Sequence, residues 1–339
     1  MFGGARGRGL DFADIVVSIP PAGRASPATF SGRRRRRGIR NTTSSHCEDL
    51  AQAKADFNAR VSRTPGRKVL VFVHGYNTRF EEAIYRFAQI VHDARVDVAP
   101  VLFTWPSGGS LTDYVYDRDS AVFSRDALET VLQALTNDPN VGSISILAHS
   151  MGSYLAVETL RQMAIRDHGL PSKIRDVMLA SPDIDVNVFS RQIAEIDAGP
   201  RTTQFTLFVS QADRALGLSS FLARGTTRLG ALDPAREPYA PMLEKARVKV
   251  VDLTRVETND VTNHSKFASS EVVTAIGDRL AQGQTLTDAK QSLVESLGTF
   301  THGAIDVAAD VVTAPTRLVD PTLREKTVDT AQDSMMLVR

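Results

Sequence analysis

A serine at a sharp turn between a strand and a helix is the feature of this sequence best suited to chemistry. Residues 144–147 form a short apolar run, and Ala-His-Ser-Met-Gly follows at 148–152, where helical periodicity begins. A serine on such a turn holds its Oγ above the sheet edge, beside helix N-terminal N–H groups that favour an oxyanion. The usual spelling is Gly-x-Ser-x-Gly, and Ala148 is small enough to replace the first glycine. The sequence therefore predicts Ser150 as a nucleophile; the alternative is a serine that only caps the helix.

A serine nucleophile needs a base to take its proton and an acid to hold that base in one tautomer. Of the seven histidines, His264 is the candidate base, because it lies after the last predicted strand and before the last predicted core helix. Asp213 is the preferred acid because it directly follows a later strand than Asp183 and Asp185 do. Each aspartate also has a structural alternative: Asp213 as a helix N-cap, and Asp183 in an Asx-type turn.

Ester or amide cleavage also requires donors for the tetrahedral oxyanion. The turn supplies the Met151 N–H, and the second donor is predicted to be the Tyr76 N–H. Gly75 lets the loop before Tyr76 turn inward. His74 is predicted to be a buried, hydrogen-bonded residue that fixes this loop rather than a catalytic one.

The elements that must position these residues alternate regularly along the chain. Strand-like runs and helical patterns of this kind predict a mainly parallel sheet with helices on both faces. In such sheets the ligand site lies beyond the carboxyl ends of the strands, where a Ser, an Asp and a His occur here in that order. The predicted strands are 69–73, 101–104, 144–147, 177–179, 205–209 and 248–253, and the predicted helices are 79–94, 120–135, 153–166, 186–196, 216–224 and 265–281.

Several motifs follow the predicted strands, and their combination is more specific than the serine turn alone. They read Phe-Val-His-Gly-Tyr-Asn at 72–77, Phe-Thr-Trp-Pro-Ser at 103–107, Tyr-Asp-Arg at 116–118, Ser-Pro-Asp-Ile-Asp at 181–185 and Ser-Gln-Ala-Asp-Arg-Ala-Leu at 210–216. With the serine motif they resemble a bacterial α/β-hydrolase family of unknown function that is described as esterase- or lipase-like. The resemblance covers residues 66–283. It implies an α/β-hydrolase fold, a triad of Ser150, Asp213 and His264, and esterase-type chemistry, but no particular substrate.

The shape of the site is predicted from the segments around it. Residues 183–205 hold little more than one helix, so no large cap is expected and the loops at 107–116 and 225–242 should line the access route. Gly75, His149 and Trp105 are the candidates for substrate contact, and core packing is an equal alternative for Trp105. A shallow cleft of this kind favours short to medium acyl chains, because each methylene contributes about 0.8 kcal/mol only when the protein can bury it.

Composition limits the class of protein. The chain has 339 residues, is 42% hydrophobic and has a net charge of +1, which supports a large core and gives no overall attraction to nucleic acid. The five arginines at 33–37 are predicted to form an exposed basic loop, with a polyanion contact as the minor alternative. The single cysteine, Cys47, excludes an internal disulfide. With no span of about 20 apolar residues and no leader-like start, a soluble protein is expected, cytoplasmic or exported after a leader is removed.

Three regions are predicted. Residues 1–65 supply a strand at 15–19, the arginine-rich loop and a helix at 48–61 that packs on the body. Residues 66–283 form the catalytic domain. Residues 284–339 form a helical extension from Leu286 to Val311, which packs on the body or on a second subunit, and an extended or disordered end from Pro315.

The sequence therefore predicts a soluble serine hydrolase that cleaves carboxylic esters, of small-molecule or lipid-like kind, through an acyl-Ser150 intermediate. No metal or organic cofactor is expected. An acyltransferase, thioesterase or peptidase with the same triad is the alternative within enzymes, because the choice of acyl acceptor depends on loop shape. A binding protein that keeps the fold without turnover is the alternative outside enzymes.

Overall fold

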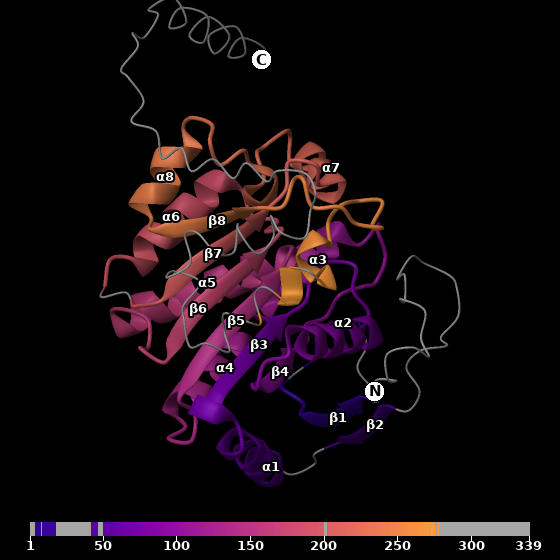
Figure 1. Ribbon diagram of the computed structural model, residues 1–339, viewed down its shortest axis with the longest axis vertical. Helices are drawn as coiled ribbons and strands as arrows, with labels where there is room; N and C mark the ends of the chain where they lie inside the picture. The colour runs from indigo at the N-terminus through magenta and orange to yellow at the C-terminus, as the bar shows by residue number, and fades with distance from the viewer. Residues whose placement is uncertain are drawn as a thin grey trace, which may run out of the picture. The chain divides into compact units, whose positions relative to one another are not determined.

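Six parallel strands form the central sheet of the computed structural model, in the order β4-β3-β5-β6-β7-β8 (Figure 1). The structure describes residues 4–7, 9–17, 42–46, 50–199, 202–270, 272–274 and 277, all within one compact unit, Met1–Ile305. The strands of the sheet are β3 (Lys68–Val73), β4 (Ala99–Phe103), β5 (Ser143–His149), β6 (Ile174–Ala180), β7 (Gln204–Val209) and β8 (Val248–Asp252). The mainly parallel sheet predicted from the alternating pattern is confirmed.

Helices follow most of the strands and cover both faces of the sheet. They are α1 (Leu50–Ser62), α2 (Phe80–Ala94), α3 (Tyr114–Phe123), α4 (Arg125–Asn137), α5 (Met151–Asp167), α6 (Val186–Ile196), α7 (Arg214–Leu222) and α8 (Tyr239–Lys245), with short 3-10 turns at Pro65–Arg67, Leu229–Ala231 and Lys266–Ala268. A parallel sheet needs such crossovers because each strand must return to the same end before the next begins. All carboxyl ends of the strands therefore meet at one edge.

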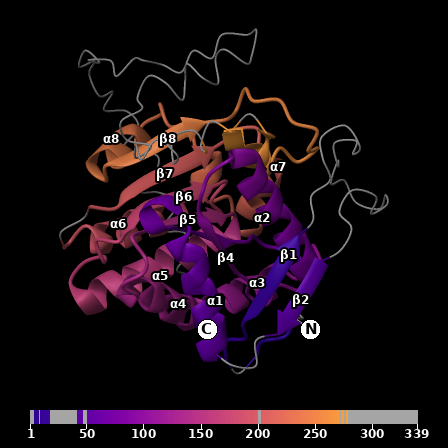
Figure 2. The same cartoon turned by 60° about the horizontal axis from the view of Figure 1, so that its bottom comes forward.

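The two faces of the sheet are packed by alternate residues of each strand. In β3, the three valines at 69, 71 and 73 join the cluster that contains α4, α5 and α6, which Figure 2 shows along one side of the strands. Leu70 and Phe72 join the other cluster, with Phe87 and Ile90 of α2. Because successive side chains of a strand point to opposite faces, two-sided burial makes the whole run apolar.

Several local predictions were wrong. Residues 42–46, predicted as loop, form β2 (Thr42–His46), which pairs antiparallel with β1 (Ala13–Val17), two residues earlier than the predicted strand. The single helix predicted at 120–135 is two helices, α3 and α4, separated at Ser124, whose hydroxyl binds the Ser120 carbonyl at 2.8 Å. A serine that binds the main chain in this way competes with the regular helix.

The segment 225–242, predicted as a loop, contains the start of α8. Leu243 is buried in the core, and Tyr239 and Met242 pack against the same cluster. Burial of these side chains favours a helix that local propensity alone does not indicate. The arginines at 33–37, Cys47, the predicted helix from Leu286 and the end from Pro315 lie outside the described residues.

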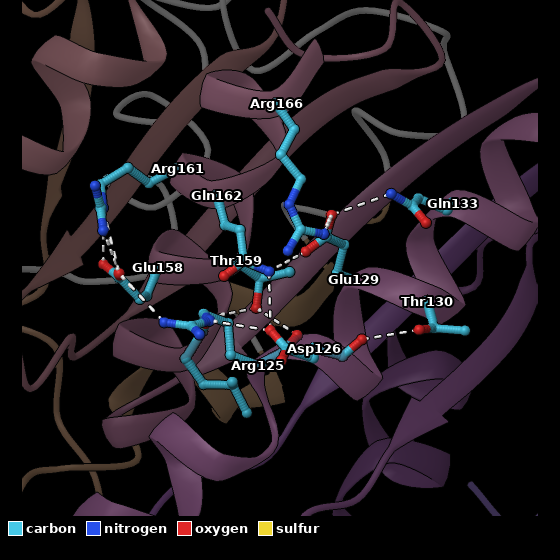
Figure 3. A network of polar contacts seen from close by, with 11 residues as sticks. Arg125, Asp126, Glu129, Thr130, Gln133, Glu158, Thr159, Arg161, Gln162 and Arg166 are labelled. Carbon is cyan, nitrogen blue, oxygen red and sulfur yellow. Dashed lines mark hydrogen bonds and ion pairs between the residues drawn. The ribbon is translucent and has the colours of Figure 1, made fainter. Parts of the chain in front are cut away.

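A network of charged side chains joins α4 to α5 (Figure 3). Glu129 accepts a hydrogen bond from Arg166 at 2.9 Å and another from Gln162. Glu158 pairs with Arg161 at 2.7 Å. The side chains of Arg161 and Arg166 are partly exposed. The network links residues of α4 and α5 and includes none of the residues that follow the strands at the carboxyl edge of the sheet.

Candidate active site

Ser150 occupies a strained turn between β5 and α5. Its backbone has φ 53° and ψ −124°, a conformation that costs a non-glycine residue about 1–3 kcal/mol. The Ser150 N–H binds the Ala180 carbonyl of β6 at 2.9 Å, and its carbonyl accepts the Asp183 N–H at 3.2 Å. Ser150 is 4% exposed. The neighbouring strand thus holds the turn in place, which is the arrangement expected of a nucleophile elbow.

Two glycines let the main chain pass close to this turn. A Cβ on Gly152 would lie 2.2 Å from the His74 carbonyl oxygen, so only glycine fits between α5 and the end of β3. A Cβ on Gly75 would lie 2.9 Å from the Ser150 Cβ and 2.8 Å from His149 Nδ1. The loop after β3 therefore runs directly against Ser150, where the sequence predicts an oxyanion donor.

Asp213 and His264 are brought together by the fold. His264 Nδ1 lies 2.7 Å from Asp213 Oδ2, and the Asp213 side chain is fully buried while His264 keeps 16% exposure. Asp213 Oδ1 also accepts the Leu216 N–H at 3.0 Å, so this residue is both the N-cap of α7 and the partner of His264. A carboxylate on Nδ1 favours the tautomer with a proton there, which leaves Nε2 free to accept one.

His149 connects His264 to the serine turn. The two imidazole rings lie 4.7 Å apart between centroids, and His149 also packs on Phe267 at 4.8 Å. Burial and the neighbouring His264 lower the pKa of His149 well below its ordinary value. His149 is therefore neutral. Its ring packs against the His264 ring, and His149 is next in sequence to Ser150.

The alternative acid, Asp183, takes part in a different group of side chains. Its carboxylate accepts hydrogen bonds from Ser219 and from Tyr114 at 2.9 Å, and its Oδ1 lies 3.3 Å from Arg228 Nε. Asp183 and Arg228 are both almost completely buried. Asp183 thus takes part in a buried ion pair, where the sequence predicted an Asx turn. Asp185 caps α6 through the Asn187 N–H at 2.8 Å.

His74 and Trp105 form a buried pair beneath the loop after β3. The Trp105 N–H donates to His74 Nε2 at 3.1 Å, so the His74 proton is on Nδ1, which donates to the Gly75 carbonyl at 2.9 Å. The rings stack with centroids 5.0 Å apart, and burial lowers the pKa of His74 to about 4. Trp105 is 4% exposed. The ring of Trp105 is thus packed on His74 in the core, which is the alternative that the sequence left open, and contact with substrate stays a prediction.

Asp117 holds the predicted oxyanion loop from the other side. Its buried carboxylate accepts the Asn77 N–H at 3.1 Å, the Gly108 N–H at 2.7 Å and the Ser107 hydroxyl at 2.6 Å. Asn77 has φ 53°, a left-handed conformation that asparagine tolerates better than most residues. The residue that follows Tyr76 in this loop is thus fixed by Asp117. Met151 begins α5, so its N–H is one of the N-terminal donors of that helix.

Sequence reasoning gave no role to Asp117, Arg228 or Asp260. Asp117 belongs to a motif that supported the resemblance, but nothing in its spacing indicates which main-chain groups it binds. Asp260 is followed by Val261 and Thr262, and an aspartate with a threonine two residues later is a signal for an Asx turn. That signal was present in the sequence and marks the loop that carries His264.

Among the residues that the structure describes, no three His, Cys, Asp or Glu side chains are grouped so as to hold a metal ion. Within the same residues, every helix is too short or too polar to cross a membrane.

Similar solved structures include Est1E from Butyrivibrio proteoclasticus, with 12% identity and a TM-score of 0.39 over 62% of this chain and 86% of that one. Another is an uncharacterized protein from Bacillus cereus, with 12% identity and a TM-score of 0.36 over 55% of this chain and 52% of that one. Likenesses this remote say nothing about activity.

A curated relative and a family model match at the level of sequence. Uncharacterized protein alr1448 of Nostoc sp. (strain PCC 7120) is 29% identical over 133 residues, which span 32% of this chain and 34% of the relative. The chain thus matches about a third of the relative's length. The family model described as alpha/beta hydrolase of unknown function (DUF900) matches residues 49–281, more than half of the chain and every strand of the central sheet. This protein is therefore an α/β hydrolase and belongs to the DUF900 family.

Proposed function

We propose that this protein is a serine hydrolase that cleaves carboxylic esters. The observation that carries the proposal is the 2.7 Å contact between His264 Nδ1 and Asp213 Oδ2, in a chain that also holds a serine at positive φ between a strand and a helix. Family membership supports the hydrolase class, and the site residues support its division into nucleophile, base and acid.

In the first half of the reaction, Ser150 Oγ attacks the ester carbonyl while His264 Nε2 takes its proton. Asp213, buried and bound to Nδ1, stabilises the imidazolium that forms. The developing oxyanion accepts hydrogen bonds from the Met151 and Tyr76 N–H groups. Collapse of the tetrahedral intermediate breaks the bond to the alcohol oxygen, which takes the proton from His264 and leaves acyl-Ser150.

In the second half, a water replaces the alcohol. His264 takes a proton from that water as its oxygen attacks the acyl carbon, and the same donors stabilise the second oxyanion. The acid then leaves as Ser150 regains its proton. Each step uses residues of this chain and needs no cofactor.

We propose short to medium acyl chains as the substrates. Between β6 and β7 the chain forms α6, whose Val186, Phe189 and Ile193 are buried in the core. That segment is used for packing, so it does not form a lid over the serine. In a series of p-nitrophenyl esters assayed with the full chain, kcat/KM is expected to reach a plateau or fall as the acyl chain lengthens. A steady rise to long chains would contradict this.

The proposal is tested with Ser150→Ala, assayed on p-nitrophenyl butyrate and with a fluorophosphonate that labels activated serines. Loss of the nucleophile should lower kcat by about 10⁴- to 10⁶-fold. The matched control is Ser145→Ala in the same strand, whose hydroxyl lies 3.4 Å from Asp176 and away from the turn. A folded Ser150→Ala protein with wild-type turnover, or a wild-type protein that neither hydrolyses esters nor reacts with the probe, would overturn the proposal.

A further inference from the structure

The segment that carries His264 is held by an aspartate outside the proposed triad. Between β8 and the turn Lys266–Ala268 the chain has no helix or strand to fix it. Asp260 Oδ2 accepts the N–H groups of His264 and Ser265, both at 2.9 Å. Asp260 Oδ1 accepts the Thr262 N–H at 3.0 Å and the Thr262 hydroxyl at 2.7 Å. One carboxylate thus fixes the main chain on both sides of Asn263.

The same segment is joined to the segment that carries Asp213. The Arg214 N–H donates to the Thr262 carbonyl at 2.9 Å, and the Asn263 amide donates to the Ala212 carbonyl at 3.3 Å. Asn263 has φ 58°, so the chain reverses direction immediately before His264. A small change in this reversal would move the imidazole away from both Asp213 and the serine turn.

The charge of Asp260 suits this role. Burial acts to raise its pKa, but hydrogen bonds from Thr262, Ser265 and His264 outweigh burial and lower the pKa below its ordinary value. The charge of Asp260 also acts on Arg86 of α2. Burial lowers the pKa of the Arg86 guanidinium, and the nearby Asp260 charge opposes this effect. Asp260 is therefore ionised at neutral pH, and carboxylates bind N–H groups more strongly than neutral acceptors do.

We propose that Asp260 is a positioning residue for His264: its carboxylate holds the His264 main chain so that the imidazole stays on Asp213 and against the His149 ring. The proposal rests on the proposed function for its effect on rate. It assigns no contact between Asp260 and substrate. The orientation of His264 then depends on two carboxylates: Asp213 binds the ring, and Asp260 binds the main chain.

The test is Asp260→Asn in the full chain, with Asp252→Asn as the matched control. Asp252 has the same turn chemistry, because its Oδ1 accepts the Thr254 N–H at 2.8 Å and the Thr254 hydroxyl, but Thr254 lies ten residues before His264. Asp260→Asn keeps one oxygen and loses the charge and the second acceptor. Misplaced catalytic groups cost up to about 100-fold in rate, so kcat on p-nitrophenyl butyrate should fall about 10- to 100-fold with KM nearly unchanged.

A second readout does not depend on turnover. The proton shared by His264 Nδ1 and Asp213 gives a low-field proton resonance, which Asp260→Asn should weaken or abolish and Asp252→Asn should keep. If the wild-type protein is inactive, the proposed function fails while this resonance still tests the positioning role. A folded Asp260→Asn protein with wild-type kcat and an unchanged resonance overturns the inference.

Thermal melting separates positioning from general loss of structure. If Asp260→Asn does not fold, Thr262→Val removes the hydroxyl that donates to Asp260 at 2.7 Å and accepts the His264 N–H at 3.4 Å. It should lower kcat about fivefold, in line with the loss of the shorter of these two hydrogen bonds. A folded Thr262→Val protein with unchanged kcat and resonance would count against the proposal in the same way.

Discussion

Carboxylates at the carboxyl edge of the sheet and carboxylates between α4 and α5 are satisfied in different ways. At the edge, Asp117, Asp213 and Asp260 each accept main-chain N–H groups. Between the helices, Glu129 and Glu158 bind arginine and glutamine side chains (Figure 3). A main-chain bond determines where a loop runs, whereas these side-chain bonds lie within or between helices that already have their shape.

The same chemical group therefore has different consequences in the two places. Loops at the edge lack a regular hydrogen-bond pattern, so the carboxylates of Asp117, Asp213 and Asp260 supply main-chain partners there. The helix pair keeps its own hydrogen bonds when a side-chain partner is lost. Substitutions at the edge should therefore affect activity or folding strongly, and substitutions between the helices should affect stability weakly.

The largest effect is expected for Asp213→Asn. The asparagine amide does not hold the tautomer of His264 that carries its proton on Nδ1 as the carboxylate does. Because of this, kcat on p-nitrophenyl butyrate should fall about 10⁴-fold. Asp183→Asn is the control, because Asp183 is buried at the same edge but binds Arg228, Tyr114 and Ser219. It should act mainly on the melting temperature. Loss of turnover in Asp183→Asn alone, with its melting temperature intact, would reverse the assignment of the acid.

The next effect concerns folding. Arg228→Met removes one member of the buried pair with Asp183 and leaves the other charge uncompensated. Breaking such a pair costs about 3–5 kcal/mol, which chemical denaturation would measure. Restoring an uncharged site with the double variant Arg228→Met, Asp183→Asn should recover part of the loss. A single variant as stable as the wild type would show that this pair contributes little.

A smaller effect is expected from pH. His74 has a folded pKa of about 4, below its ordinary value of 6.5, so between these values the unfolded chain binds more protons. Stability is therefore lost as pH falls from 6.5 towards 4, by about 2 kcal/mol between pH 7 and pH 5. Urea denaturation at the two pH values measures this. His74→Asn should reduce the difference in unfolding free energy between pH 7 and pH 5. If the difference is unchanged in that variant, groups other than His74 cause it.

The smallest effect belongs to the helix pair. Arg161→Met removes one of the partners of Glu158, with the arginine side chain 32% exposed, while Gln192 still donates to the same carboxylate at 2.8 Å. Such pairs contribute about 0.2–1 kcal/mol, and kcat should not change. Urea denaturation and the ester assay on the same sample check both statements. If Arg161→Met loses several kcal/mol of unfolding free energy, the expected difference between the carboxyl edge of the sheet and the α4–α5 pair is wrong.

The arrangement around Ser150 could be predicted because consecutive residues determine it. Ser150 and Gly152 occupy a turn whose close contacts admit only small neighbours, and that requirement is visible in five positions. The meeting of Asp213 and His264 followed from topology, since parallel strands bring their carboxyl ends to one edge. Whether they act as acid and base remains a prediction.

The contacts that support the site could not be predicted in the same way. Asp117 and Asp260 bind main-chain groups of loops, which have no periodicity to indicate their course. The place of Trp105 depended on the His74 ring that stacks on it, because a strand end can face either the core or a cleft. The helix α8 depended on burial of Leu243 against other elements. Each of these outcomes required the tertiary structure.

The position of β8 as the last strand in the sheet order has a consequence for inactivation. His264 follows this strand, and β8 is hydrogen-bonded to β7 at one side of the sheet. Strands at an edge open more readily than central ones, so a local opening of β8 removes His264 while β3, β5 and β6 keep their pairing. Amides of β8 should exchange with deuterium before those of β5. Activity should therefore disappear on warming before the protein melts.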